Sequence, residues 1–170
     1  MSPRVVLVGA PGSGKTTVGR LLARSLDVAF RDTDADIEAA AGKTISDIFI
    51  DEGEQGFRDR ESAALQSALS ECDGVLSLGG GIVLRAENRA LLHDQQVVWL
   101  EVTLADAVDR VGLAASRPVL MGNVRGRLME LLQERTPLYT DVAVHRVSTH
   151  GKKPSEIASE IEAMLGSKHA

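Results

Sequence analysis

This sequence has a single cysteine, no long apolar run and no excess of positive over negative charge. The single cysteine, Cys72, cannot form an internal disulfide, which favours a reducing compartment, and within its alanine-rich stretch it is expected to fill core space. No apolar run reaches the 18 residues that a membrane-spanning helix needs. The net charge of −5 argues against a nucleic-acid-binding surface. We therefore expect a cytoplasmic protein whose partners include neither nucleic acid nor membrane.

The length and the hydrophobic pattern predict one compact α/β domain. A chain of 170 residues with 44% hydrophobic content suits a single domain over residues 1–170. Amphipathic helical patterns, with breaks near Gly42 and Gly53 and an N-cap at Thr103, separate short apolar runs. The pattern breaks up at 112–126, which predicts a basic, lid-like loop. This alternation indicates a three-layer domain with a parallel sheet. The apolar runs expected to form its strands are residues 4–8, 28–30, 75–78, 96–102 and 142–147.

Residues 9–16 form the most specific motif in the chain, GAPGSGKT. They match G-x-x-x-x-G-K-[ST] at every fixed position and lie between a predicted buried strand and an amphipathic helix. The glycines allow successive backbone N–H groups to surround phosphate oxygens, and the helix N-terminus adds positive potential. We expect Lys15 to reach the β- and γ-phosphates of a nucleoside triphosphate and the Thr16 hydroxyl to ligate Mg²⁺.

The usual companions of this phosphate loop in GTPases and motor ATPases are missing. The best candidate for a Walker-B strand, residues 75–78, is followed by Gly79 instead of an acid, and no Asn-Lys-x-Asp element occurs. The metal-side carboxylate is therefore expected from Asp32 or Asp34, which follow the second strand. Alternate residues of an extended segment point the same way, so both acids are expected at the ligand edge of the sheet. The alternative is a polar turn that caps the next helix through Asp34.

Two further features suggest a pocket for an acceptor molecule. Arg58 lies on one helical face with Glu54 and Glu61, which orient it as a fork for a carboxylate. The alternative is a solvated surface ion pair. Three glycines, 79–81, follow a buried strand, and such a run predicts close approach of the backbone to a ligand.

Together these motifs resemble the shikimate kinase family, in order along residues 4–154. The likeness departs at Val119, where leucine is usual, and at Lys152 and Lys153, where arginine is more usual. The motifs that carry it are the phosphate loop at 9–16, Asp32-Thr33-Asp34, Phe57-Arg58-Asp59-Arg60-Glu61, Gly79-Gly80-Gly81, Arg117-Pro118-Val119-Leu120 and Arg135-Thr136-Pro137-Leu138-Tyr139.

The resemblance implies ATP-dependent phosphorylation of the 3-hydroxyl of shikimate. Separately, we expect the protein to be monomeric. The resemblance also implies a P-loop kinase fold like that of nucleoside monophosphate kinases, with a five-stranded parallel sheet and a closing lid. Thr16 and Asp32 would serve Mg²⁺, and Lys15, Asp34 and Arg117 would be catalytic. The implied ATP-binding residues are Gly12, Ser13, Gly14, Lys15, Thr16, Thr17, Arg110, Arg117, Lys152, Lys153 and Pro154.

On the acceptor side, the resemblance implies that Asp34 holds the shikimate hydroxyls, as a base or as a positioning group. Arginines would bind the substrate carboxylate, with Glu61 orienting Arg58, while Ile45, Phe49 and Phe57 would line the apolar side of the pocket. The implied substrate-binding residues are Asp34, Arg58, Glu61, Gly79, Gly80, Gly81 and Arg135.

Two alternatives remain at this point. One is another small-metabolite P-loop kinase, such as a gluconate-type kinase, which would need a pocket for an acyclic sugar acid. The other is a nucleotide-dependent switch without kinase activity, which predicts slow hydrolysis and no acceptor site. The set of Asp34, Arg58 and Arg135 favours a kinase over the switch.

Overall fold

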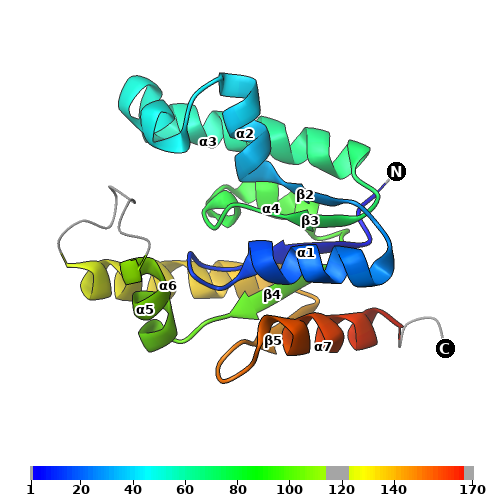
Figure 1. Ribbon diagram of the computed structural model, residues 1–170. Helices are drawn as coiled ribbons and strands as arrows, with labels where there is room; N and C mark the ends of the chain where they lie inside the picture. Colours follow the sequence, from blue (N-terminus) through cyan, green and yellow to red (C-terminus); the bar gives the residue numbers. More distant parts are fainter. Residues whose placement is uncertain (1, 114–122, 167–170) are drawn as a thin grey trace.

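A computed structural model describes residues 2–113 and 123–166 (Figure 1). Short strands alternate with helices along the chain, as the sequence pattern predicts. The elements are β1 (Val5–Val8), α1 (Lys15–Leu26), β2 (Phe30–Asp32), α2 (Thr33–Ala41), α3 (Ile45–Glu71), β3 (Val75–Ser77), the 3₁₀ turn η1 (Ile82–Leu84), α4 (Ala86–Leu92), β4 (Val97–Glu101), α5 (Leu104–Leu113), α6 (Val124–Val142), β5 (His145–Ser148) and α7 (Pro154–Gly166).

The strands form one parallel sheet in the order β2-β3-β1-β4-β5. The predicted five-stranded parallel sheet is therefore confirmed. The prediction for the fifth strand was wrong at its start, because Val142 ends α6 and β5 begins only at His145. Val142 is buried against the core, and an apolar residue at the end of a helix reads in sequence like the start of a strand.

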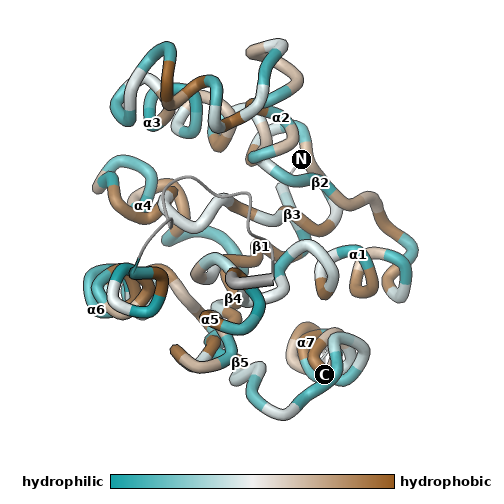
Figure 2. The backbone as a smooth tube through the Cα atoms, turned by 60° about the vertical axis from the view of Figure 1, so that its left-hand side comes forward, coloured by the Kyte–Doolittle hydropathy of each residue, from teal (hydrophilic) through white to brown (hydrophobic). Residues whose placement is uncertain are grey.

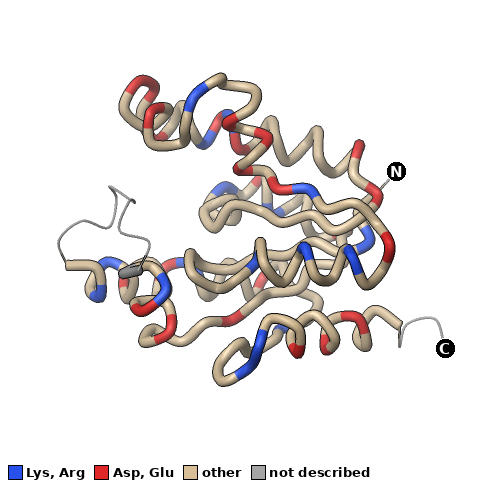
Figure 3. Tube along the Cα trace, viewed as in Figure 1, with Lys and Arg blue, Asp and Glu red and all other residues tan. Residues whose placement is uncertain are grey.

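The sheet lies between two helical layers, each with its own apolar core. On β1, Val5 and Leu7 pack with residues of α1 and α7, whereas Val6 and Val8 pack with residues of α3, α4 and α6. This alternation follows from the period of two along a strand. Figure 2 shows hydrophobic and hydrophilic colours alternating along the helices. In Figure 3 the helices carry charges of both signs, and the central strands are largely uncharged. The three-layer α/β prediction is confirmed.

Helix α2 and the N-terminal half of α3, here called the α2–α3 unit, lie beside the β2 edge and share a small core of Ile37, Ile48 and Phe57. The predicted breaks near two glycines are confirmed. Gly42 ends α2 with a φ of 69°, and Gly53 interrupts α3 with a φ of 73° and a ψ of 178°. Residues with a side chain rarely adopt these positive φ values, and glycine therefore allows both bends.

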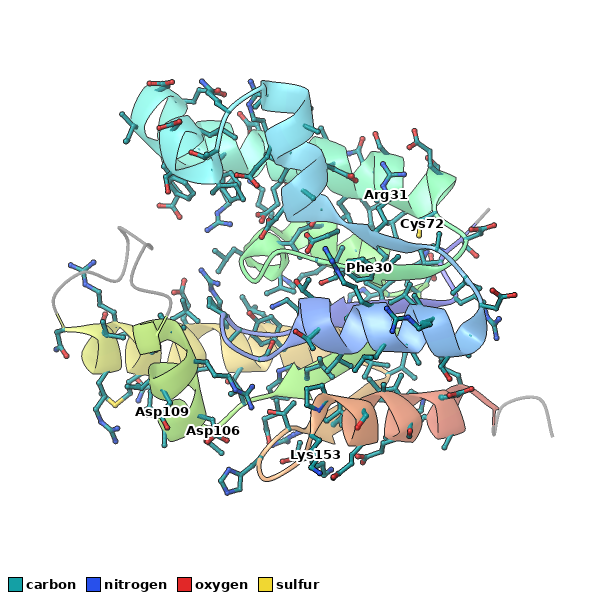
Figure 4. All side chains as sticks on the ribbon, in the orientation of Figure 1. Phe30, Arg31, Cys72, Asp106, Asp109 and Lys153 are labelled. Atoms are coloured by element: carbon teal, nitrogen blue, oxygen red, sulfur yellow. The ribbon has the colours of Figure 1, made fainter. Side chains whose placement is uncertain are left out.

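The predicted lid falls mainly on residues 114–122, which lie outside the described part of the chain together with Arg117. The two ends of its predicted range, 112–126, are helical. Gly112 belongs to α5, and α6 begins at Val124 behind the N-cap Asn123. Within residues 2–113 and 123–166, no helix combines the length and apolarity needed to cross a membrane. Cys72 is buried at the end of α3 (Figure 4), as expected for core filler.

Candidate active site

The phosphate loop connects β1 to α1. Gly12 and Gly14 have φ values of 81° and 88°, which turn the backbone so that the loop curls over the start of α1. Lys15 is the first residue of α1, and its Nζ donates to the carbonyl of Gly9 at 2.6 Å. Ser13 is buried in the loop. The predicted loop thus has the strand–loop–helix setting that phosphate binding requires.

The two residues predicted to serve a metal lie together at the start of α1 and the end of β2. The Thr16 hydroxyl donates to Asp32 Oδ2 at 3.4 Å. The other oxygen of Asp32 accepts a bond from the backbone N–H of Asp34 at 2.8 Å, which makes Asp32 the N-cap of α2. The alternative in which Asp34 caps this helix is therefore wrong. Asp34 instead lines a cavity next to the phosphate loop.

This cavity has a volume of about 520 Å³ and lies between the phosphate loop, the α2–α3 unit and α6. It brings together Asp34, Arg58, Glu61 and Arg135 with the three glycines of the β3 end, as predicted. It also contains the three apolar residues expected from the resemblance. The full lining is Pro11, Asp34, Glu38, Thr44, Ile45, Ser46, Phe49, Ile50, Phe57, Arg58, Glu61, Gly79, Gly80, Gly81, Leu131 and Arg135.

Arg58 and Glu61 form a buried ion pair in the wall of the cavity. Arg58 Nη1 donates to Glu61 Oε1 at 2.8 Å, and the two side chains are only 11% and 2% exposed. Glu54 is a weaker partner at 3.6 Å. A solvated surface pair does not fit this burial. The pair holds the guanidinium of Arg58 in one orientation, as the sequence predicts.

The glycines after β3 allow the backbone to reach the charged groups of the cavity. A Cβ atom on Gly81 would collide with the guanidinium of Arg58, and one on Gly79 would lie 2.6 Å from Asp34 Oδ1. Any side chain here would push these groups from their places. The absence of side chains at these glycines therefore allows the end of β3 to lie close to Arg58 and Asp34.

The buried Nε–H groups of Arg58 and Arg135 donate to no acceptor among the described residues. Both side chains line the same cavity. A buried donor without a hydrogen bond is costly, and a ligand carboxylate would satisfy it. The cavity is therefore suited to an anionic ligand of small size.

Sequence reasoning assigned no role to Thr33 or Tyr139, and both hold the glycine run in place. Thr33 Oγ1 accepts from the Gly79 N–H at 3.1 Å, and Tyr139 Oη donates to the Gly80 carbonyl at 2.6 Å. Burial raises the pKa of Tyr139 to about 12, so its hydroxyl stays a donor. Thr33 lies between the predicted acids Asp32 and Asp34 and begins α2, and its place inside this motif was the available signal. Further lining residues that were missed are Pro11, Glu38, Thr44, Ser46, Ile50 and Leu131.

The residues predicted to flank adenine are only partly brought together. Arg110 of α5 donates to the carbonyl of Gly12 at 2.7 Å, which places it against the phosphate loop. Lys152 instead pairs with Glu160 of α7 at 2.9 Å. Lys153 and Pro154 stand at the start of α7, and Figure 4 shows Lys153 there.

The match to known proteins covers almost the whole chain. A model of the shikimate kinase family matches residues 11–166. The chain belongs to the shikimate kinase family. It is 57% identical to a shikimate kinase of Salinispora tropica over 167 residues, which is 98% of this chain and 100% of that protein. Among solved structures, an Acinetobacter baumannii shikimate kinase in complex with shikimate is similar with a TM-score of 0.93 and 38% identity, covering 99% of this chain and 94% of the other.

The gluconate-type alternative has support at the level of the fold alone. A gluconokinase from Sinorhizobium meliloti aligns with a TM-score of 0.59 and 19% identity over 96% of this chain and 91% of the other. The shikimate kinase family is therefore favoured over this alternative. The family uses ATP with Mg²⁺.

The charge state of Glu61 predicts a pH dependence of acceptor binding. Burial raises the pKa of Glu61 above its usual 4.5, although Arg58 opposes this shift. As the pH falls through this raised pKa, Glu61 becomes neutral and no longer orients Arg58, so KM for shikimate is expected to rise. The loss should begin at a higher pH than for an ordinary glutamate.

The measurement is KM for shikimate against pH in the wild type and in Glu61→Gln, with KM for ATP as the internal control. The variant should have a raised KM for shikimate at neutral pH and should lack the acidic rise attributed to Glu61. An identical acidic rise in both proteins would assign it to another group.

Proposed function

We propose that this protein transfers the γ-phosphoryl group of ATP to the 3-hydroxyl of shikimate, giving shikimate 3-phosphate and ADP. The observation that carries the proposal is the cavity beside the phosphate loop, where Asp34 shares the lining with two half-buried arginines, Arg58 and Arg135. Shikimate has one carboxylate and several hydroxyls, which are complementary to these groups. The product would feed the synthesis of aromatic amino acids.

The donor side is formed by the phosphate loop. The N–H groups of Gly12, Ser13, Gly14, Thr16 and Thr17 would surround the phosphates, and Lys15 would exchange its bonds to loop carbonyls for phosphate oxygens. Arg110, which already contacts the Gly12 carbonyl, would lie beside the nucleotide. We extend this site to Lys152, Lys153 and Pro154 as the adenine side.

Thr16 and Asp32 are suited to hold Mg²⁺. A hydroxyl and a carboxylate are hard oxygen ligands, and Mg²⁺ commonly takes one or two such protein groups together with substrate phosphates. The Thr16 hydroxyl in the first turn of α1 lies 3.4 Å from Asp32 Oδ2 at the end of β2. When bound, Mg²⁺ neutralises charge on the phosphates of ATP. Arg117, outside the described residues, keeps its predicted role at the transferring phosphate.

On the acceptor side, Arg58 and Arg135 would bind the shikimate carboxylate, with the backbone of Gly79, Gly80 and Gly81 against the ring. Asp34 would then accept a hydrogen bond from the 3-hydroxyl and is placed to receive its proton. The bond between that oxygen and phosphorus forms as the bond from the γ-phosphorus to the bridging oxygen of ADP breaks. Because phosphoryl transfer has a loose transition state, positioning contributes more than base strength.

The test is coupled ADP release by the wild type with Mg²⁺ and ATP, in the presence of shikimate, of gluconate or of no acceptor. Release that depends on shikimate is expected, with gluconate giving the same low rate as the sample without acceptor. ADP release that depends on gluconate and not on shikimate would favour the gluconate-type kinase. Equal slow release in all three samples would favour a nucleotide switch.

A further inference from the structure

Arg85 connects the β3 end of the site to helix α3 through side-chain contacts that the proposed chemistry does not use. It follows η1 directly, and its guanidinium contacts Asp59 Oδ1 at 2.9 Å, Gln55 Oε1 at 3.1 Å and Ser62 Oγ at 3.4 Å. Its side chain is 23% exposed. One arginine thus joins two turns of α3 to the segment that carries the glycine run.

The residues that Arg85 contacts lie next to the acceptor-binding residues of the same helix. Gln55, Asp59 and Ser62 are spaced by four and three residues, so they form one stripe of α3. Arg58 and Glu61 precede Asp59 and Ser62 by one residue each and face the cavity. A shift of the stripe would therefore shift the Arg58–Glu61 pair with it.

The anchor of Arg85 is itself held firmly. Arg89 of α4 donates to the carbonyls of Val83 and Leu84 at 2.7 and 3.1 Å, and Asn88 donates to the Ile82 carbonyl at 3.0 Å. These bonds fix the 3₁₀ turn between the glycine run and Arg85. The contact of Gly81 with Arg58 and the contacts of Arg85 thus join the same two segments at two points.

The kink at Gly53 makes this connection specific to one part of α3. Gly53 breaks the helix before Gln55, so residues 54–71 are tied to the β3 end, whereas Ile45 and Phe49 of the cavity wall lie on the other side of the break. Arg85 contacts only the part of α3 after the kink, so it holds the carboxylate-binding side of the cavity independently of the apolar side.

We propose that Arg85 is a positioning residue for the acceptor site, holding Arg58 and Glu61 in register with the glycine run. This inference rests on the proposed function, because it concerns the shikimate side of the same cavity. Arg85 does not line the cavity in the described structure, so it acts through α3. Its loss should weaken shikimate binding and leave the ATP side unchanged.

The experiment compares the wild type with Arg85→Ala and Arg85→Lys, using KM for shikimate, KM for ATP, kcat and the melting temperature. Arg85→Ala is expected to raise KM for shikimate by about fivefold, with KM for ATP within about 1.5-fold of the wild type. Arg85→Lys keeps the positive charge but loses the forked guanidinium, so its KM for shikimate should lie between those of the wild type and Arg85→Ala.

The matched control is His93→Asn. His93, the C-cap of α4, bonds Asp141 of α6 at 3.0 Å, and neither residue lines the cavity. This variant removes a surface contact of the same neighbourhood and should keep both KM values. A second test is Asp59→Ala, alone and combined with Arg85→Ala, since the two changes remove the same contact and should be non-additive.

The proposal fails if Arg85→Ala changes both KM values equally, or if it lowers only the melting temperature and leaves KM for shikimate at the wild-type value. It also fails if His93→Asn raises KM for shikimate as much as Arg85→Ala does. Wild-type turnover of shikimate in the same assay separates this failure from failure of the proposed function, which would leave all proteins without acceptor-dependent activity.

Discussion

Replacing Lys15 by alanine is expected to lower kcat for shikimate phosphorylation by about 10³-fold. Lys15 is the first residue of α1 and its Nζ already lies within the phosphate loop, 2.6 Å from the Gly9 carbonyl. A positive charge at this place stabilises the charge that develops between the β- and γ-phosphates during transfer. KM for shikimate should change little, because the acceptor cavity does not include Lys15.

The measurement is steady-state kinetics with saturating shikimate, and Arg20→Ala is the control. Arg20 lies on the same helix, where its guanidinium stacks over Phe30 at 5.6 Å, and its loss removes an equal charge from α1. That control should keep kcat near the wild-type value. A Lys15→Ala variant with kcat within about tenfold of wild type would contradict the assigned role of the phosphate loop.

Replacing Arg58 by alanine is expected to raise KM for shikimate by about 100-fold, the loss of a charge-assisted contact with a carboxylate. The same change leaves Glu61, whose side chain is 2% exposed, without its closest counter-charge. Breaking such a buried pair costs about 3 kcal/mol of folding free energy. The melting temperature should therefore fall together with shikimate affinity.

Arg58→Lys separates binding from folding. The lysine keeps a positive charge beside Glu61, so stability should largely return, but it cannot form the two-pronged contact and KM for shikimate should stay raised. Arg60→Ala is the control on the same helix, since Arg60 pairs with Glu52 at 2.9 Å outside the cavity. Normal shikimate turnover by both Arg58→Lys and Arg58→Ala would contradict the assignment of Arg58 to the acceptor site.

The local motifs of the site could be predicted because their geometry is set by nearby residues. The phosphate loop needs only β1, its glycines and the start of α1. The pairing of Arg58 with Glu61 follows from a spacing of three on one helix. Asp32 and Asp34 were placed at one edge by strand alternation, and the helix cap, considered only for Asp34 as the alternative, is formed by Asp32.

Contacts between distant segments left no comparable signal. The bond from Tyr139 to Gly80 spans 59 residues, and that from Gly79 to Thr33 spans 46. Arg85 reaches Gln55 across 30 residues. Such pairs depend on how the layers pack, which hydrophobic periodicity does not specify. The start of β5 was also missed, because an apolar helix end and a buried strand share the same composition.

The adenine side shows a further limit of sequence spacing. Lys152 was assigned to the adenine side, with Lys153 and Pro154, from the family resemblance. In the structure it bonds Glu160, eight residues further on, because a residue before a helix can reach a partner on its second turn. Arg110, assigned to the adenine side by the same resemblance, lies against the phosphate loop through its bond to the Gly12 carbonyl.

The most direct test of the central claim is the identity of the product. The wild-type protein is incubated with ATP, Mg²⁺ and shikimate, and the mixture is followed by phosphorus NMR and mass spectrometry. One phosphomonoester on the 3-hydroxyl of shikimate is predicted, formed in equal amount with ADP. Inorganic phosphate as the sole new phosphorus species, at a rate independent of shikimate, would contradict the proposed phosphoryl transfer.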